Sequence, residues 1–176
     1  PASVSGISTA TSPSGGGSFT CALLSGGTVK CWGNGYSGQL GNGLNTQSNS
    51  TPVSVSGIST ATSISSNSSS SSSTCAILSG GTIKCWGVGN KGQLGNGSTS
   101  NWSTPVSVNN ISTASSVSKG YRHSCAVLSG GTIKCWGEGG NGQLGNGSTS
   151  DQSTPVSVSG ITTATSVSPG YRHTCA

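Results

Sequence analysis

The chain has 176 residues and a formal net charge of +5, and charged side chains occupy only 5% of its positions. Ser and Thr supply 40 and 20 residues, against 29 for Leu, Ile, Val and Phe together, so hydroxyl groups provide most of the polar surface. The basic residues are spread singly, so we expect no nucleic-acid surface and interpret one lysine per repeat as a solvated side chain. No apolar stretch approaches 18 residues, so we expect no membrane span.

The sequence repeats itself with a period of about 50 residues. Cysteines recur at separations of 54, 50 and 50 residues, at Cys21, Cys75, Cys125 and Cys175. Residues 75–108 and 125–158 are identical at 28 of 34 positions. We therefore divide the chain into repeat units at 1–51, 52–104 and 105–154, with a partial fourth unit at 155–176.

Each unit contains four short strand patterns. In the second unit these are PVSV at 52–55, ISTATSIS at 58–65, TCAIL at 74–78 and TIKCW at 82–86, with Gly, Ser and Asn between them. Four strands in about 50 residues are typical of a propeller blade. The sequence predicts an all-β fold of four-stranded antiparallel blades, three complete and one partial, as part of a larger propeller or repeat array.

The hairpin in each unit fixes which cysteines face each other. A three-residue loop at 25–27 places Gly27 at the left-handed position that such loops favour. Counting back from the loop sets Cys21 opposite Cys31 in a non-hydrogen-bonded pair, whose Cα atoms lie about 4.5 Å apart. A disulfide bridges that separation. The predicted disulfides are Cys21–Cys31, Cys75–Cys85 and Cys125–Cys135, and Cys175 stays unpaired in this stretch.

Two other states of these cysteines are compatible with the pattern. Metal thiolates are one, although a spacing of ten residues without a second close Cys or His pair matches no common zinc site. Free buried thiols are the other. The register favours disulfides, and disulfides indicate an oxidising compartment, so we expect the protein outside the cell or on its surface.

The glycines of CWGNGYSGQLGNG, residues 31–43, match the G-x-G-x-x-G pattern of dinucleotide sites. That pattern binds a phosphate only where it opens a helix, and the following glycines and asparagine are poor helix formers. The same pattern recurs in the next two units. We therefore expect no nucleotide and no other cofactor or metal.

The string GYRHSCAVLSGGTIKCWGEGGNGQLGNG, residues 120–147, resembles the repeat of the regulator-of-chromosome-condensation family, and its cysteine-bearing hairpin resembles the secreted bacterial branch. The resemblance covers nearly the whole chain and implies blades of a propeller, usually of seven. The family includes a nucleotide exchange factor, a photoreceptor and a secreted enzyme inhibitor, so the fold leaves the function open.

Within the family, exchange activity relies on acidic residues and loop insertions. The chain has only two acids, and tyrosines replace the tryptophans of the photoreceptor's G-W-R-H-T motif, so neither activity carries over.

Within this fold, several side chains receive a structural interpretation. Trp32, Trp86 and Trp136 repeat at a fixed strand end and are expected to fill the core between blades. His123 and His173 are interpreted as structural histidines. No catalytic set of carboxylates, serine and histidine shares a neighbourhood, so we expect no enzyme.

Binding residues are expected where the units differ. These positions form variable loops at 34–37, 88–91 and 138–141, with a contact loop at Lys91, Asn101 and Trp102, where Trp102 replaces polar residues of the other units. N-glycosylation sequons occur at Asn49, Asn67, Asn96, Asn101, Asn110 and Asn146.

Two functions follow from these patterns. The first is an extracellular structural scaffold, a fibre or surface-layer component with glycans. The second is a discrete seven-bladed propeller that binds a protein or glycan through its variable loops. Either requires self-association or further repeats of the same chain, because an open blade exposes apolar surface and strand edges.

Overall fold

The structure is a computed structural model that describes residues 3–45, 48–67 and 72–176. Residues 68–71 of the serine-rich stretch at 65–73 lie outside the described residues. Strands are the only regular elements longer than a turn in the described part of the chain. The all-β fold predicted from the repeat pattern is therefore confirmed.

Three four-stranded antiparallel sheets follow one another along the chain. We call them blades 1, 2 and 3. Blade 1 contains β1 (Ala10–Gly15), β2 (Phe19–Leu24), β3 (Val29–Gly33) and β4 (Asn49–Ser54). Blade 2 contains β5 (Ala61–Ser66), β6 (Ser73–Leu78), β7 (Ile83–Gly87) and β8 (Trp102–Ser107). Blade 3 contains β9 (Ala114–Lys119), β10 (His123–Leu128), β11 (Ile133–Gly137) and β12 (Gln152–Ser157), and a two-stranded ladder of β13 (Ser168–Pro169) and β14 (Thr174–Cys175) follows.

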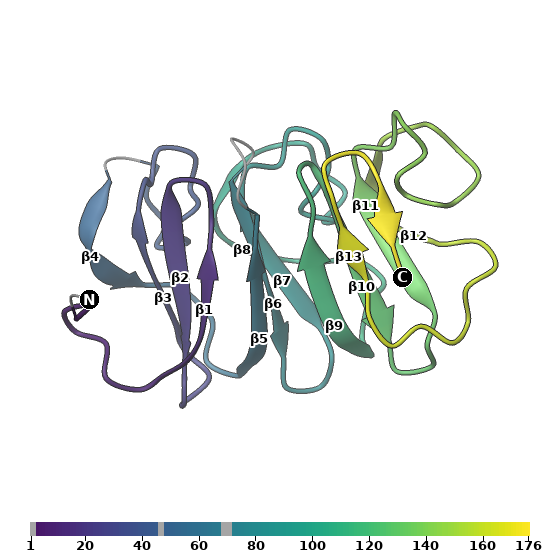
Figure 1. The fold of residues 1–176 in the computed structure, drawn as a ribbon. Helices are drawn as coiled ribbons and strands as arrows, with labels where there is room; N and C mark the ends of the chain where they lie inside the picture. The colour runs from purple at the N-terminus through teal and green to yellow at the C-terminus, as the bar shows by residue number, and fades with distance from the viewer. Residues whose placement is uncertain (1–2, 46–47, 68–71) are drawn as a thin grey trace.

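The sheets stand side by side in chain order, as Figure 1 shows. The main contacts between strands of neighbouring blades involve the first strand of each later sheet: β5 contacts β1 and β2 of blade 1, and β9 contacts β5 and β6 of blade 2. The fourth strands, β4, β8 and β12, therefore lie at the opposite edge of each sheet, away from the neighbouring first strands.

The grouping of strands differs from the one the sequence units suggest. The strand predicted at 52–55 overlaps β4 at residues 52–54. β4 pairs with β3 and closes blade 1, instead of opening blade 2. Its short alternating pattern is compatible with either neighbour, and the hydrogen-bond ladder decides. The sheets are thus offset by one strand from the units at 52–104 and 105–154, whose boundaries stay a prediction.

The hairpin register predicted from the three-residue loop is confirmed. Ala22 pairs with Lys30 and Cys21 with Cys31, and Gly27 has a φ of 75°. The structure contains the three disulfides Cys21–Cys31, Cys75–Cys85 and Cys125–Cys135, each with Cα atoms 4.1 Å apart. Cys175 is free and exposed. Each disulfide spans the middle two strands of a blade and lies fully buried.

The hydrophobic core is divided among the junctions between blades. Trp86 of β7 packs into a cluster with Leu40, Val55 and Ile58, which follow β3 and β4 of blade 1. Trp136 of β11 packs in the same way against blade 2. Both indoles are 0% exposed, as expected for inter-blade core, whereas Trp32 of blade 1 is only half-buried.

Candidate functional site

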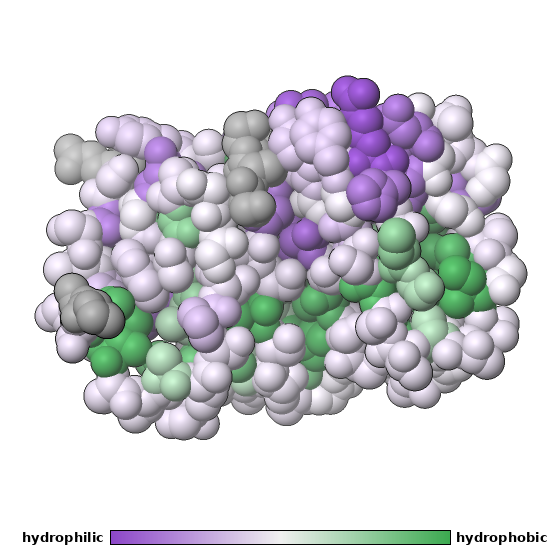
Figure 2. All heavy atoms as spheres, in the orientation of Figure 1, coloured by the Kyte–Doolittle hydropathy of each residue, from purple (hydrophilic) through white to green (hydrophobic). Residues whose placement is uncertain are grey.

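One edge of the row of blades carries the longest connections, which join the third strand of each blade to the fourth. Because the strands are antiparallel, β1, β3, β5, β7, β9 and β11 end at this edge and the even-numbered strands up to β12 begin there. We call the described parts of these connections, together with the turn at 170–173 between β13 and β14, the loop edge: 16–18, 34–45, 48, 67, 72, 88–101, 120–122, 138–151 and 170–173. Figure 2 shows the most hydrophilic residues gathered over this edge, above blades 2 and 3.

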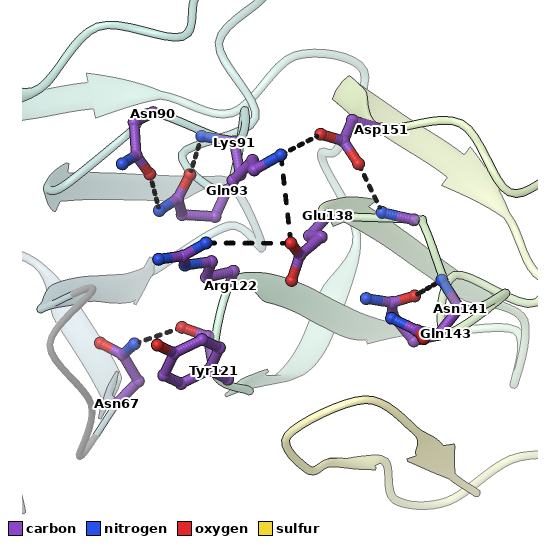
Figure 3. Close-up of polar contacts among 11 residues, drawn as sticks. Asn67, Asn90, Lys91, Gln93, Tyr121, Arg122, Glu138, Asn141, Gln143 and Asp151 are labelled. Carbon is purple, nitrogen blue, oxygen red and sulfur yellow. Dashed lines mark hydrogen bonds and ion pairs between the residues drawn. The ribbon is translucent and has the colours of Figure 1, made fainter.

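Both acidic residues of the chain lie on the loop edge and form ion pairs there. Lys91 of blade 2 reaches across to blade 3, with its Nζ 3.0 Å from Asp151 Oδ2 and 4.0 Å from Glu138 Oε1. Arg122 Nη1 lies 3.9 Å from Glu138 Oε1. Figure 3 shows the four side chains as one chain of contacts. This network joins the loops of two neighbouring blades.

Asp151 also holds the loop on which it lies. Its Oδ1 accepts a hydrogen bond from the Gly139 amide at 2.9 Å, and Asn101 Oδ1 accepts the equivalent bond from Gly89 in blade 2 at 3.0 Å. Partial burial of Asp151 favours the protonated carboxyl and so raises its pKa. The hydrogen bonds from Gly139 and Lys91, together with the positive charge of Lys91, outweigh this effect, so the pKa of Asp151 is lowered. Asp151 is therefore an ionised anchor for Lys91.

Two tyrosines stack beside the charged network. The rings of Tyr121 and Tyr171 have centroids 4.1 Å apart, and Asn67 Nδ2 donates to the backbone oxygen of Tyr121 at 2.8 Å. The guanidinium of Arg122 lies 5.1 Å from the Tyr121 ring centroid, and that of Arg172 lies 5.3 Å from the Tyr171 centroid. Tyr171 is 53% exposed, so this surface offers a planar aromatic group flanked by a cation.

Lys119 is buried, in contrast to the one solvated lysine expected in each repeat. It is 8% exposed, and its Nζ donates to Ser124 Oγ at 2.8 Å and to the backbone oxygen of Gln93 at 3.2 Å. Burial lowers the pKa of Lys119 to about 7. Lys119 is buried because it ends β9, whose last side chain turns into the junction between blades 2 and 3.

His123 is fully buried next to Lys119. Its Nε2 lies 2.9 Å from Thr174 Oγ1, and Thr174 in turn donates to the backbone oxygen of Gln143 at 2.7 Å. Since that bond uses the hydroxyl proton, Nε2 of His123 is the donor to Thr174. Burial, followed by the charges of Lys119 and His173, lowers the pKa of His123 to about 4. His123 thus stays neutral and links blade 3 to the β13–β14 ladder.

The three predicted contact residues lie on or beside the loop edge in different environments. Trp102 begins β8 and is 38% exposed. The side chain of Asn101 accepts the Gly89 amide, and that of Lys91 is engaged by Asp151. Trp102 is therefore the one of the three whose side chain is held by no hydrogen bond or ion pair among the described residues.

Arg122, Arg172 and the tyrosine stack were not predicted as a group from the sequence. The signal was present, because G-Y-R-H occurs at 120–123 and 170–173 in the last two units. Its meaning depended on the packing of blades, which brings the two loops together.

The sequons differ in their surroundings. Asn67 is buried, and its Oδ1 accepts the Ser73 amide at 2.8 Å, so its amide is committed within the fold. Asn101 and Asn110 are exposed, and Asn49, Asn96 and Asn146 are half-buried. Glycosylation at any of them stays a prediction.

Within residues 3–45, 48–67 and 72–176, no three His, Cys, Asp or Glu side chains lie close enough to hold a metal ion. The described residues also form no helix that is long and apolar enough to cross a membrane.

Comparison with known proteins identifies the repeat. The profile of the Regulator of chromosome condensation (RCC1) repeat matches residues 81–127 and 131–176, and a second profile of this repeat matches 14–39 and 114–143. The chain belongs to the RCC1 repeat family. A curated relative, the Ultraviolet-B receptor UVR8 of Arabidopsis thaliana, is 33% identical over 95 residues, which are 54% of this chain and 21% of UVR8.

Solved structures of RCC1-type propellers share the fold. Human WBSCR16 superposes with a TM-score of 0.80 at 21% identity, over 94% of this chain and 43% of that protein. Prp20p of Saccharomyces cerevisiae superposes with a TM-score of 0.79 at 20% identity, over 96% of this chain and 43% of Prp20p. The sheets are therefore propeller blades, and the chain spans about two fifths of the length of these two proteins.

Proposed function

We propose that this RCC1-repeat chain is a non-enzymatic scaffold that binds a partner protein through its loop edge. The observation that carries the proposal is the contrast between framework and loops. Residues 75–108 and 125–158 differ at six positions, and five of these, 88, 90, 91, 101 and 102, lie on the loop edge or at the start of β8 beside it. Variation confined to one edge of a constant framework is typical of a recognition surface.

The chemistry of the loop edge suits a protein partner. Lys91 and Arg122 neutralise the two carboxylates, whereas Arg172 has no ion pair among the described residues and stands over the exposed ring of Tyr171. An aromatic ring next to arginine is a frequent anchor in protein interfaces. Prp20p, which has the same fold, was described together with its binding to Gsp1p and histones, and this supports protein recognition by the fold.

The three disulfides support an oxidising location. Such bonds persist outside the cell and in secretory compartments, where thiols are not kept reduced. We therefore place the binding function outside the cell or on its surface, where the exposed sequons Asn101 and Asn110 are accessible to glycosylation.

A second candidate is the structural scaffold, a fibre or surface-layer component assembled by further repeats or self-association. The near-identity of the repeats favours it. The superposition on propellers favours ring curvature instead, because a set of blades matches over 94–96% of the chain only if the angle between consecutive blades is similar. Electron imaging of native assemblies separates the two: discrete rings support the binding module, and continuous fibres support the structural scaffold.

The binding function is tested by affinity capture with matched variants. Arg172→Ala combined with Tyr171→Ala removes the exposed aromatic and cationic groups of the loop edge, and Lys84→Ala on β7 serves as the control. Proteins from the surrounding medium that bind the wild type and the control, but not the double variant, support the proposal. If the double variant retains the same proteins as the wild type, the loop edge is not the binding surface.

A further inference from the structure

The loop at 34–45 of blade 1 packs against the start of β8 in blade 2. Gly43 donates its amide to the backbone oxygen of Ser103 at 2.9 Å, and an added Cβ at Gly38 would lie 2.7 Å from the Ser103 Cα atom. The long loop of blade 2 packs on β12 of blade 3 by the same two contacts, both at Ser153. The two junctions therefore have the same backbone construction, and their surfaces can be compared position by position.

Three of the exposed large apolar side chains belong to the junction between blades 1 and 2. Tyr36 is 63% exposed, Leu44 is 56% exposed and Trp102 is 38% exposed. Trp102 directly precedes Ser103, Leu44 directly follows Gly43, and Tyr36 lies two residues before the other glycine that touches Ser103. The three side chains therefore stand on backbone segments that meet at one serine. We call Tyr36, Leu44 and Trp102 the apolar rim.

The equivalent positions at the junction between blades 2 and 3 are polar. The repeats align the apolar rim with Asn90, Ser98 and Gln152. Local hydrogen bonds support this alignment, because the Leu44 amide donates to Asn42 Oδ1 at 3.2 Å and the Ser98 amide donates to Asn96 Oδ1 at 3.2 Å. The exposed apolar side chains are thus a property of one junction and not of the repeat.

Charged residues are distributed in the opposite way. The junction between blades 2 and 3 carries the ion pairs of Lys91 with Glu138 and Asp151, which Figure 3 shows. The aligned positions at the junction between blades 1 and 2 are uncharged, and they are Ser37, Val88 and Asn101. The segments 34–45 and 100–107 contain no charged residue at all. A ligand that lies on the apolar rim therefore meets no charged side chain of these segments, which favours an uncharged ligand.

The polar groups beside the apolar rim are amides and hydroxyls. Asn45, Ser100 and Asn101 are exposed. Asn101 Oδ1 accepts the Gly89 amide at 3.0 Å, which leaves its Nδ2 group as a donor. The C–H face of a sugar ring packs on an aromatic ring, and its hydroxyls both donate and accept hydrogen bonds. Protein interfaces are instead enriched in arginine beside aromatic residues, and neither segment contains an arginine.

We propose that the apolar rim binds a neutral β-1,4-linked glycan, with Tyr36 and Trp102 as the platforms on which sugar rings stack. A chain of β-1,4-linked glucose or N-acetylglucosamine is extended, and its equatorial substituents leave a flat C–H face on each ring. Leu44 adds apolar surface beside the two aromatic rings. The inference goes beyond the proposed function, because it concerns another ligand class and a different part of the molecule from Tyr171 and Arg172.

The test measures the binding of cellohexaose and chitohexaose to the 176-residue chain, prepared without N-linked glycans, by isothermal titration calorimetry. We expect at least one of the two to bind, and their comparison shows whether the acetamido group contributes. Maltohexaose is the control ligand, because its α-1,4 linkages coil the chain and prevent neighbouring rings from presenting one flat face. Absence of binding by both β-linked hexasaccharides at millimolar concentrations would overturn the inference, and so would equal binding of maltohexaose.

Matched variants locate the binding site. Tyr36→Asn, Leu44→Ser and Trp102→Gln together give the first junction the residues of the second, so the exchanged side chains already occur on this backbone. The dissociation constant should rise at least about tenfold, as expected for the loss of aromatic anchors. An unchanged constant in this triple variant would overturn the inference.

Tyr171→Ala combined with Arg172→Ala serves as the control and should bind the glycan as the wild type does. The same double variant removes the groups on which protein capture by the loop edge depends. Glycan binding and protein capture are therefore measured separately, so failure of one proposal is distinguishable from failure of the other.

Discussion

The indole of Trp136 donates its N–H to the backbone oxygen of Gln93 at 3.0 Å, across the junction between blades 3 and 2. The same oxygen accepts Ser124 Oγ at 2.8 Å and Lys119 Nζ at 3.2 Å. A single backbone carbonyl on a blade 2 loop therefore receives three donors from blade 3. The junction depends on the position of this loop as much as on apolar burial.

Replacing Trp136 with alanine should destabilise the protein strongly. The side chain is fully buried and hydrogen-bonded, and truncation of a buried tryptophan costs about 3–5 kcal/mol of unfolding free energy. Trp32→Ala is the matched control, since Trp32 is half-buried and the described residues provide no blade in front of it. Denaturant titration by circular dichroism under non-reducing conditions measures both. Equal losses for the two variants would show that the indole junction is not the source of stability.

Gly95→Ala should cost more stability than Gly145→Ala. The two glycines have similar backbone conformations, with φ of 74° and 63°, so the conformational strain of alanine is about the same at both. Only at Gly95 would the added Cβ meet the tryptophan, and overpacking of this kind costs about 1–3 kcal/mol more. The difference between the two denaturation midpoints isolates the indole contact. A Gly145→Ala loss as large as that of Gly95→Ala would mean that backbone strain alone accounts for both.

The hairpin was predictable from the sequence because its register is local. A three-residue loop ending in a left-handed glycine determines which residues face each other, and Cys21 and Cys31 follow by counting. The grouping of strands into sheets was not predictable in the same way. The pattern at 52–55 pairs equally well with the strands before and after it, and the choice depends on blade packing.

The ion-pair network could not be predicted from the sequence for a related reason. Lys91 and Asp151 are 60 residues apart and belong to different repeats, and their contact exists only because consecutive blades are rotated by a set angle. Lys119 likewise looks like a surface lysine in SKGYRHS. It is buried because it ends an inner strand, and nothing in the local pattern marks that strand as inner.

Lys119 should make stability depend on pH. Its pKa is about 7 in the folded state and 10.5 in the unfolded state, so between these values the unfolded chain binds a proton that the folded chain lacks. The free energy of unfolding therefore rises with pH across this window, by at most about 1.4 kcal/mol per pH unit, and the cost is complete below pH 7. Denaturation midpoints at pH 6, 7, 8 and 9 measure the slope.

Lys119→Ser is the control for this pH dependence, because Ser66 occupies the equivalent position in blade 2. Both proteins carry Cys175→Ser, which prevents thiol exchange at high pH. His123 does not contribute in this window, since its pKa is about 4. The serine variant should be more stable at pH 7 and should show a flat profile between pH 7 and 9. A flat profile in the parent protein would instead place the Lys119 amine in contact with water.

The disulfides should be visible as a thiol count and as a stability difference. The chain has seven cysteines, and under denaturing, non-reducing conditions only Cys175 should react with a thiol reagent, whereas all seven react after reduction. Replacing Cys75 and Cys85 together with alanine opens a short loop and should lower the unfolding free energy by about 2–3 kcal/mol. Seven reactive thiols before reduction would show that the disulfides are absent. The argument for an oxidising compartment would then fail as well. A double variant as stable as the parent would show that the hairpin register, and not the covalent bond, holds the middle of each blade.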